Sequence, residues 1–106
     1  MAITREDWSW QFDYCFACGR KPWGVLGGLQ THEIARGPHR QKALKEPAAW
    51  LRLCARCHEQ LPNDIAYQLR LKRDNDPEHY DRVKVNRLRG REGDAVTESE
   101  VDSVGE

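Results

Sequence analysis

The sequence predicts a small α+β domain built around a zinc ion. Two Cys-x-x-Cys pairs use all four cysteines of the chain, which is the spacing of a four-thiolate zinc site. Two short apolar segments, residues 29–34 and 50–53, have the composition of strands, and the second leads directly into the second cysteine pair. Helix start signals follow that pair. A chain of 106 residues has so small a core that a metal clamp matters to its stability.

One structural zinc ion is expected to bind all four cysteines, which are Cys15, Cys18, Cys54 and Cys57. The alternatives are two disulfides or four unrelated buried thiols. They are disfavoured because no secretory segment is evident and cysteines separated by two residues bond each other only with strain. Gly19 is expected to supply the backbone freedom needed just past the second sulfur. A closed four-sulfur site leaves no position for a substrate, so any chemistry must come from other residues.

The charges of the chain are distributed unevenly, although they sum to zero. Residues 92–106 carry six of the 17 acidic residues and no basic one, so residues 1–91 hold all 17 Lys and Arg against 11 acids. A basic body favours an anionic partner, with nucleic acid as the leading candidate, and a solvated mixed-charge surface is the alternative. We expect a folded domain over residues 1–90 and an acidic, mobile tail over residues 91–106.

No apolar run approaches the length of a membrane span, and no cleavable signal precedes the first cysteine. These features predict an intracellular protein that has no membrane partner. They give no indication of its oligomeric state.

The chain begins with a helix start signal followed by an aromatic segment. Thr4 is expected to be an N-cap, with Asp7 at the third helical position. From Trp8 to Tyr14 aromatic and polar residues alternate, which favours an extended segment, while Trp8 and Phe12 also pair at helical spacing. The aromatic side chains are expected to build a core over the zinc rather than a platform for nucleic-acid bases.

Between the two predicted strands lies a long segment, Ala35 to Ala49, which is expected to be a loop. Loops of this length in a small domain are more often functional than idle. Its basic residues are candidates for contacts with nucleic acid, and the residues we assign to this role are Arg36, His39, Arg40 and Lys42.

Three helices are expected after the second cysteine pair, the first of them short. A helix beginning at His58 is interrupted by Pro62, and Asn63 is expected to cap the next one. Asp76 and Pro77 repeat the start signal for a last helix that ends near Gly90. Within the tail, Thr97 and Glu100 have the spacing that starts a single helical turn.

The order of these motifs resembles that of the HNH family of nucleases. Three sequences carry the resemblance, CFACG at 15–19, LQTHEI at 29–34 and WLRLCARCH at 50–58. The resemblance covers about residues 15–62. It implies a zinc-bound ββα-metal fold, here with two additional C-terminal helices. It also implies cleavage of a DNA phosphodiester bond with the help of one divalent ion such as Mg²⁺ or Mn²⁺.

The resemblance assigns roles to three residues. His32 matches one ligand of the catalytic ion, and His58 matches the other. Adjacent side chains at a helix start point about 100° apart, so Cys57 and His58 are not expected to bind the same zinc. Glu33 stands where the family usually has the histidine that deprotonates the attacking water, and a glutamate can act as that base or as a metal ligand. The structural alternative for His58 is packing against the zinc turn.

The sequence also departs from the family pattern. The asparagine that pins the segment between the strands is replaced by Ala49, and Pro62 stands where many members have a further ligand. His39 could stand in for the absent basic imidazole.

Three functions therefore follow from the sequence. The first is a metal-dependent DNA endonuclease that nicks or cuts the phosphate backbone. The second is a catalytically impaired, zinc-stabilised nucleic-acid-binding module. The third is a zinc-bound adaptor for a protein partner.

Overall fold

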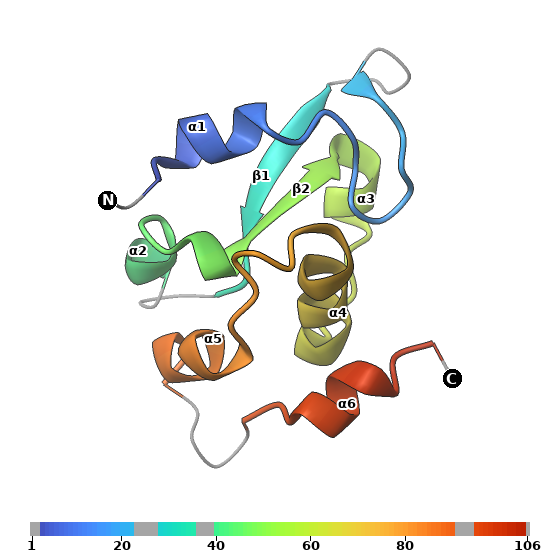
Figure 1. Ribbon diagram of the computed structural model, residues 1–106. Helices are drawn as coiled ribbons and strands as arrows, with labels where there is room; N and C mark the ends of the chain where they lie inside the picture. Colours follow the sequence, from blue (N-terminus) through green and yellow to red (C-terminus); the bar gives the residue numbers. More distant parts are fainter. Residues whose placement is uncertain (1–2, 23–27, 36–39, 91–94, 106) are drawn as a thin grey trace.

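A two-stranded antiparallel sheet lies at the centre of the computed structural model, which describes residues 3–22, 28–35, 40–90 and 95–105 (Figure 1). Strand β1 spans Leu29–Glu33 and strand β2 spans Trp50–Cys54. Their register pairs Leu29 with Cys54 and Glu33 with Trp50. Both strands lie where the apolar segments predict them, and the predicted α+β class is confirmed.

The two faces of this sheet carry different side chains because successive residues of a strand point to opposite sides. Thr31, Glu33 and Trp50 face the N-terminal helix, while His32 and Leu51 face the helices that follow β2. In Figure 1 the helix α1 lies along one side of the strands and α3 and α4 lie along the other. The two faces therefore provide two separate environments.

Helix α1 spans Arg5–Trp10, so the extended conformation expected from Trp8 to Tyr14 is wrong over Trp8–Trp10, while residues 12–14 lie in neither a helix nor a strand. The predicted N-cap is confirmed, because the Thr4 hydroxyl accepts a hydrogen bond from the backbone N–H of Asp7 at 3.1 Å. Burial decides between the alternating and the helical spacing of the aromatic residues. Trp8 is completely buried and its ring packs at 4.9 Å from Phe12 and 5.6 Å from Trp50, so the helical spacing of Trp8 and Phe12 is the one that the core uses.

The segment between the strands is not a continuous loop. It contains helix α2, Arg40–Ala43, and the 3-10 helix η3, Pro47–Ala49. Both are fixed to the sheet, since the indole of Trp50 donates to the Ala43 carbonyl at 2.7 Å and the Ile34 N–H donates to the Ala49 carbonyl at 2.7 Å. Backbone groups thus tie this segment to β1 although Ala49 has no side-chain amide.

The first three helices after the sheet start at residues that differ from the predicted ones. They are α3 (Ala55–Glu59), α4 (Ile65–Asn75) and α5 (Arg82–Leu88). Asp64 rather than Asn63 caps α4, and Asp81 rather than Asp76 caps α5. Asp76 is drawn into a buried ion pair, so its carboxylate does not cap a helix and Pro77 lies in a turn.

The tail predicted to be mobile is folded over residues 95–105. Helix α6, Glu98–Asp102, begins with the predicted capping box of Thr97 and Glu100. It packs on α4, and Val101 is completely buried. The Asn86 side chain accepts from the Val96 N–H at 3.1 Å and donates to its carbonyl at 2.8 Å. The acidic composition gave no sign of this packing, in which Val96 and Val101 are buried and Asn86 binds the Val96 backbone.

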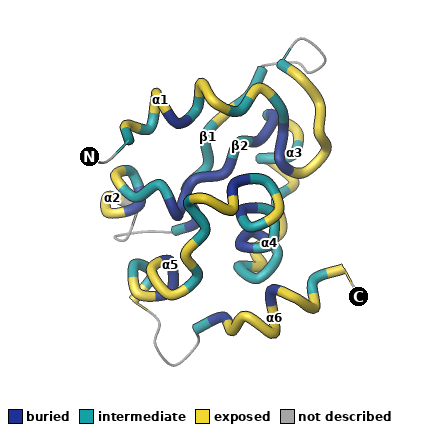
Figure 2. The backbone as a smooth tube through the Cα atoms, viewed as in Figure 1, coloured by how far each residue is buried: buried dark blue, intermediate teal, exposed yellow. Residues whose placement is uncertain are grey.

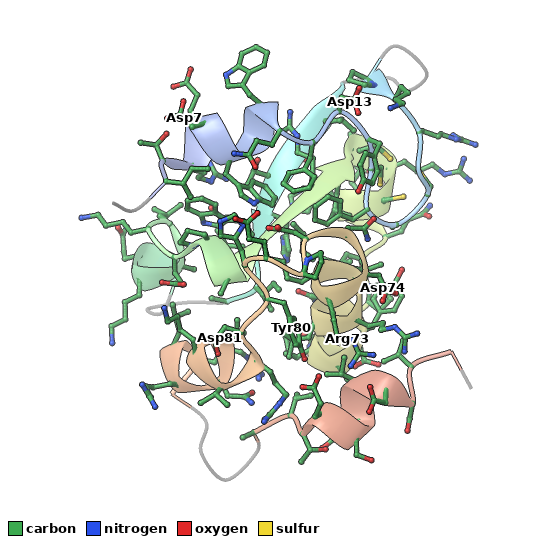
Figure 3. All side chains as sticks on the ribbon, viewed as in Figure 1. Asp7, Asp13, Arg73, Asp74, Tyr80 and Asp81 are labelled. Atoms are coloured by element: carbon green, nitrogen blue, oxygen red, sulfur yellow. The ribbon has the colours of Figure 1, made fainter. Side chains whose placement is uncertain are left out.

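Charged side chains add to this docking. Arg73 contacts both Glu98 and Asp102, and the Tyr80 hydroxyl donates to Glu98 at 2.8 Å. Figure 3 shows Arg73 and Tyr80 in the space between α4 and α6. Hydrogen bonds from Tyr80, Arg73 and Arg82 hold the pKa of Glu98 below its usual value. Among the described residues no helix is long and apolar enough to cross a membrane.

A charged pair is enclosed in the core. Buried positions are concentrated along β2 and on the inner sides of α4 and α5 (Figure 2). Lys72, completely buried on α4, donates to Asp76 at 2.7 Å and to the Trp50 carbonyl at 3.0 Å, and lies 4.5 Å from the centre of the Trp8 ring. Asp76 also accepts from the Trp8 indole at 2.8 Å. Burial lowers the pKa of Lys72 to about 8, against the opposing effect of Asp76.

The substitution Asp76→Asn should destabilise the fold strongly, because it leaves the Lys72 ammonium group buried without its counter-charge. We expect the free energy of unfolding to fall by about 3–5 kcal/mol. Asp74→Asn is the matched control, since Asp74 pairs with Arg70 at the exposed surface and should cost less than about 1 kcal/mol. Urea unfolding of both variants measures this difference, and equal losses would contradict the role given to the buried pair.

Candidate functional site

The four cysteines converge on one point from three parts of the chain. Cys15 and Cys18 lie in the turn after α1, Cys54 ends β2 and Cys57 lies in α3. Their sulfur atoms all lie within 4.8 Å of one another, and Cys18 Sγ is 3.9 Å from Cys54 Sγ. The sulfur atoms, yellow in Figure 3, gather beside α3. Zn–S bonds of about 2.3 Å place the sulfurs of a tetrahedral site about 3.8 Å apart, so the cluster could hold a structural metal such as zinc.

The same distances exclude disulfides. A disulfide requires about 2.05 Å between the sulfur atoms, and all four cysteines are free thiols. The backbone supports the cluster in two places. Cys54 caps α3 and accepts from the Cys57 N–H at 3.5 Å, and Gly19 has a φ of 76°, as the predicted need for conformational freedom requires.

The thiols influence one another's ionisation. Burial acts to raise the pKa of Cys15, but hydrogen bonds from the backbone of Cys54, Cys18 and Ala17 outweigh it and lower the pKa to about 7. Burial and contacts with the other thiols raise the pKa of Cys57. Crowded sulfurs resist full ionisation unless a cation compensates their charge, which is what a bound metal supplies.

His32 and His58 meet beside α3, the helix that carries Cys57. His32 comes from β1 and faces α3, where His58 directly follows the last cysteine. His32 Nδ1 lies 3.2 Å from His58 Nε2. Two imidazoles bound to one metal ion at 2.0–2.1 Å have their nitrogens about 3.0–3.4 Å apart, so this separation fits a shared ion. The structure thus brings together the two histidines that the sequence singled out.

Two glutamines orient the outer nitrogens of this pair. Gln68, on α4, donates from Nε2 to the Pro62 carbonyl at 3.1 Å, so its Oε1 faces His32 Nε2 at 3.1 Å. Because a carbonyl oxygen only accepts, His32 carries its proton on Nε2. Gln30 Oε1 lies 2.6 Å from His58 Nδ1 and, as a carbonyl oxygen, accepts a hydrogen bond from that nitrogen. In the neutral imidazoles the lone pairs of the two inner nitrogens therefore converge, an arrangement that a cation between them stabilises.

A pocket of about 230 Å³ opens onto the two histidines. Its other lining residues are Glu33, Ala35, Glu59, Leu61, Ile65 and Gln68. In the described part of the chain, only the cysteines form a group of three or more metal-ligating side chains close enough to share an ion. An ion at the histidine pair would therefore have two protein ligands and positions left for water and substrate, as a catalytic metal requires.

Glu33 lines this pocket but is also engaged on the opposite face of the sheet. Its carboxylate is 6% exposed, and Oε1 lies 3.0 Å from a guanidinium nitrogen of Arg5. Arg5 in turn donates to the Thr31 carbonyl at 2.7 Å. The side chain predicted to act as a base is thus held by α1, a contact that nothing in the strand motif indicates.

The basic residues assigned to nucleic acid are only partly placed. Arg36 and His39 lie outside the described residues. Arg40 is the first residue of α2, and Lys42 is exposed on the same helix. Sequence reasoning missed Gln68 and Arg5, since a lone glutamine or arginine carries no motif. The available signal for Gln68 was its place one turn after the Asp64 helix start.

The chain matches no known family model, no characterised protein and no solved structure. The resemblance to the HNH nucleases therefore rests on the three sequence motifs described above.

Removing one sulfur of the cluster should collapse the fold, because in so small a domain the metal-binding energy is also folding energy. Cys54→Ser is expected to lose both bound zinc and the cooperative melt, whereas Ala55→Ser beside it should retain both. Elemental analysis and circular dichroism measure these two properties. A purified parent that is free of zinc and still melts cooperatively would refute the structural role of the cluster.

Proposed function

We propose that the protein is a metal-dependent DNA endonuclease whose divalent ion is held by His32 and His58. The observation that carries this proposal is the 3.2 Å approach of the two imidazole nitrogens at a pocket. The order of β1, β2 and α3 beside a four-cysteine cluster supports it, since it is the order that the resemblance to the HNH nucleases implies.

The chain's residues have distinct roles in the proposed reaction. His32 and His58 would hold the divalent ion, which would supply Lewis-acid chemistry by polarising the scissile phosphate and lowering the pKa of a bound water. His32 and His58 supply neutral imidazole nitrogens, and Gln68 and Gln30 keep their protons on the outer nitrogens. The pocket is large enough for a phosphate group with a few waters, and the cysteine cluster fixes His58 through its neighbour Cys57.

Glu33 is the proposed general base because it follows His32 on β1 and lines the pocket, and acting as the base requires its carboxylate to leave Arg5 on the other face of the sheet. The contact with Arg5 also fits a purely structural carboxylate. This second possibility favours the alternative function, a nucleic-acid-binding module that keeps the zinc clamp and has lost cleavage. The two functions differ in what the parent protein does to a phosphodiester bond.

Supercoiled plasmid should be nicked or linearised when the zinc-loaded protein is incubated with Mg²⁺ or Mn²⁺. His58→Ala should abolish nearly all cleavage while the variant keeps its structural zinc and its melt, because His58 is not a ligand of the cysteine cluster. His79→Ala is the control imidazole, since His79 contacts Asp76 and does not line the pocket. Agarose electrophoresis and elemental analysis measure the two properties.

Glu33→Gln tests the base within the same assay. The rate should fall by roughly 10²–10⁴-fold with unchanged DNA binding, whereas Glu59→Gln, at the exposed rim of the pocket, should cut at nearly the parental rate. A Glu33→Gln variant as fast as the parent excludes this carboxylate as the base. Salt-dependent DNA binding without cleavage under any divalent ion would favour the binding module, and the absence of both would favour the protein adaptor.

Gln68→Leu should weaken the binding of a second metal ion by about 10–100-fold, because His32 loses the acceptor that fixes its proton. Titration calorimetry with Co²⁺ on protein that already contains structural zinc measures this affinity. Gln60→Leu, an exposed glutamine at the end of α3, is the control and should leave the affinity unchanged. Equal affinities for the parent and Gln68→Leu would show that the glutamine does not orient the ligand.

A further inference from the structure

Trp10 differs from the other tryptophans that the structure describes. Trp8 and Trp50 are buried, whereas the Trp10 side chain is 80% exposed. It lies two positions after Trp8 on α1, about 200° around the helix, so it points away from the core that Trp8 fills. A large aromatic ring so fully exposed contributes little to the fold and is available to a ligand.

A hollow of about 460 Å³ lies beside this ring. We call it the Trp10 hollow, and its lining residues are Arg5, Glu6, Ser9, Trp10 and Arg52. Arg5 and Ser9 are one turn apart on α1, as are Glu6 and Trp10, so the helix presents one continuous side to the hollow. Arg52 comes from β2 and forms the opposite wall.

Arg52 is held in place without a negative partner. Its Nε donates to the Phe12 carbonyl at 3.3 Å and its Nη1 donates to the Thr31 hydroxyl at 3.2 Å. None of the ion pairs among the described residues includes Arg52 or Glu6. Burial lowers the pKa of Arg52, and the nearby charge of Arg5 lowers it further. The hollow thus holds two guanidinium groups and one carboxylate, Glu6, and because Glu6 forms no ion pair with Arg52, the fixed Arg52 guanidinium favours an anion beside it.

We propose that the Trp10 hollow binds an unpaired nucleotide of a nucleic-acid strand, with its base stacked on the Trp10 ring and its phosphate beside Arg52. Stacking on an exposed indole accepts any base, because every base has a π-face, and a guanidinium matches the geometry of a phosphate. A protein partner fits less well, since Trp10 is the single apolar residue of a lining that is otherwise polar or charged.

The Trp10 hollow and the histidine pocket lie on opposite faces of the sheet and are linked through one ion pair. Arg5 lines the Trp10 hollow and contacts Glu33, which lines the pocket of the two histidines. This inference rests on the proposed function and adds to it a substrate class, single-stranded nucleic acid or a strand with an unpaired base.

Binding without added divalent ion tests the inference separately from cleavage. A fluorescently labelled 12-nucleotide DNA strand and its duplex are titrated with zinc-containing protein, and fluorescence anisotropy gives the affinities. Trp10→Ala should weaken single-strand binding by about 5- to 150-fold, the effect of losing one stacked base, and leave duplex binding unchanged. Trp10→Phe should restore most of the affinity. Val83→Ala, at another exposed apolar side chain, should bind like the parent.

A strand with abasic sites gives a second measurement. The parent should bind it as weakly as Trp10→Ala binds the normal strand, since both lack the stacked base. Equal single-strand affinities for the parent and Trp10→Ala would overturn the inference, as would a parent that binds no single strand. Trp10-dependent binding by a protein that cuts nothing would support the inference while refuting the nuclease. Cleavage that depends on His58 but not on Trp10, with equal binding, would refute the inference alone.

Discussion

The convergence of four cysteine sulfurs is the constraint on which the rest of the structure depends. Cys54 both ends β2 and caps α3, so the direction of the helix is set by the strand before it. The turn that carries Cys15 and Cys18 follows α1, which places the aromatic core of Trp8 beside the sheet. A sheet of only two strands is marginal by itself. The cysteine cluster therefore holds this small sheet to the rest of the chain, a role that additional strands have in a larger domain.

The histidine pair depends on the same cysteine cluster, because its residues lie close in sequence to the elements that the cluster fixes. The two-residue period of β1 puts Gln30 and His32 on the face toward α3, and His58 follows Cys57 directly. Gln68 completes the arrangement from α4, where its amide is fixed by the Pro62 carbonyl. Proline at this position supplies no ligand, yet its carbonyl oxygen orients the residue that orients His32. A departure from the family pattern thus takes part in the site through the backbone.

The sequence predicted the parts of the fold that depend on local spacing. Strand positions, the cysteine cluster and the meeting of His32 with His58 follow from motifs, and the structure has all three. The misses arise where a tertiary contact overrides a local signal. Asp76 and Pro77 start no helix because Lys72 binds the carboxylate, and α1 is helical because Trp8 must reach the core. Gln68 was missed because its contact with His32, a residue 36 positions earlier, depends on the tertiary fold.

The folded tail changes where the positive charge of this protein is available. Glu98 and Asp102 pair with Arg73, and Glu98 also pairs with Arg82, so the C-terminal helices neutralise much of their own charge. Because α6 packs on α4, its acidic side chains pair with arginines of α4 and α5 and not with those of the sheet. Among them Arg52 has no carboxylate partner, and it stands beside an exposed indole. Arg52 is therefore one basic group of the body that the described part of the acidic tail leaves unpaired, and it lies on the sheet that also carries His32.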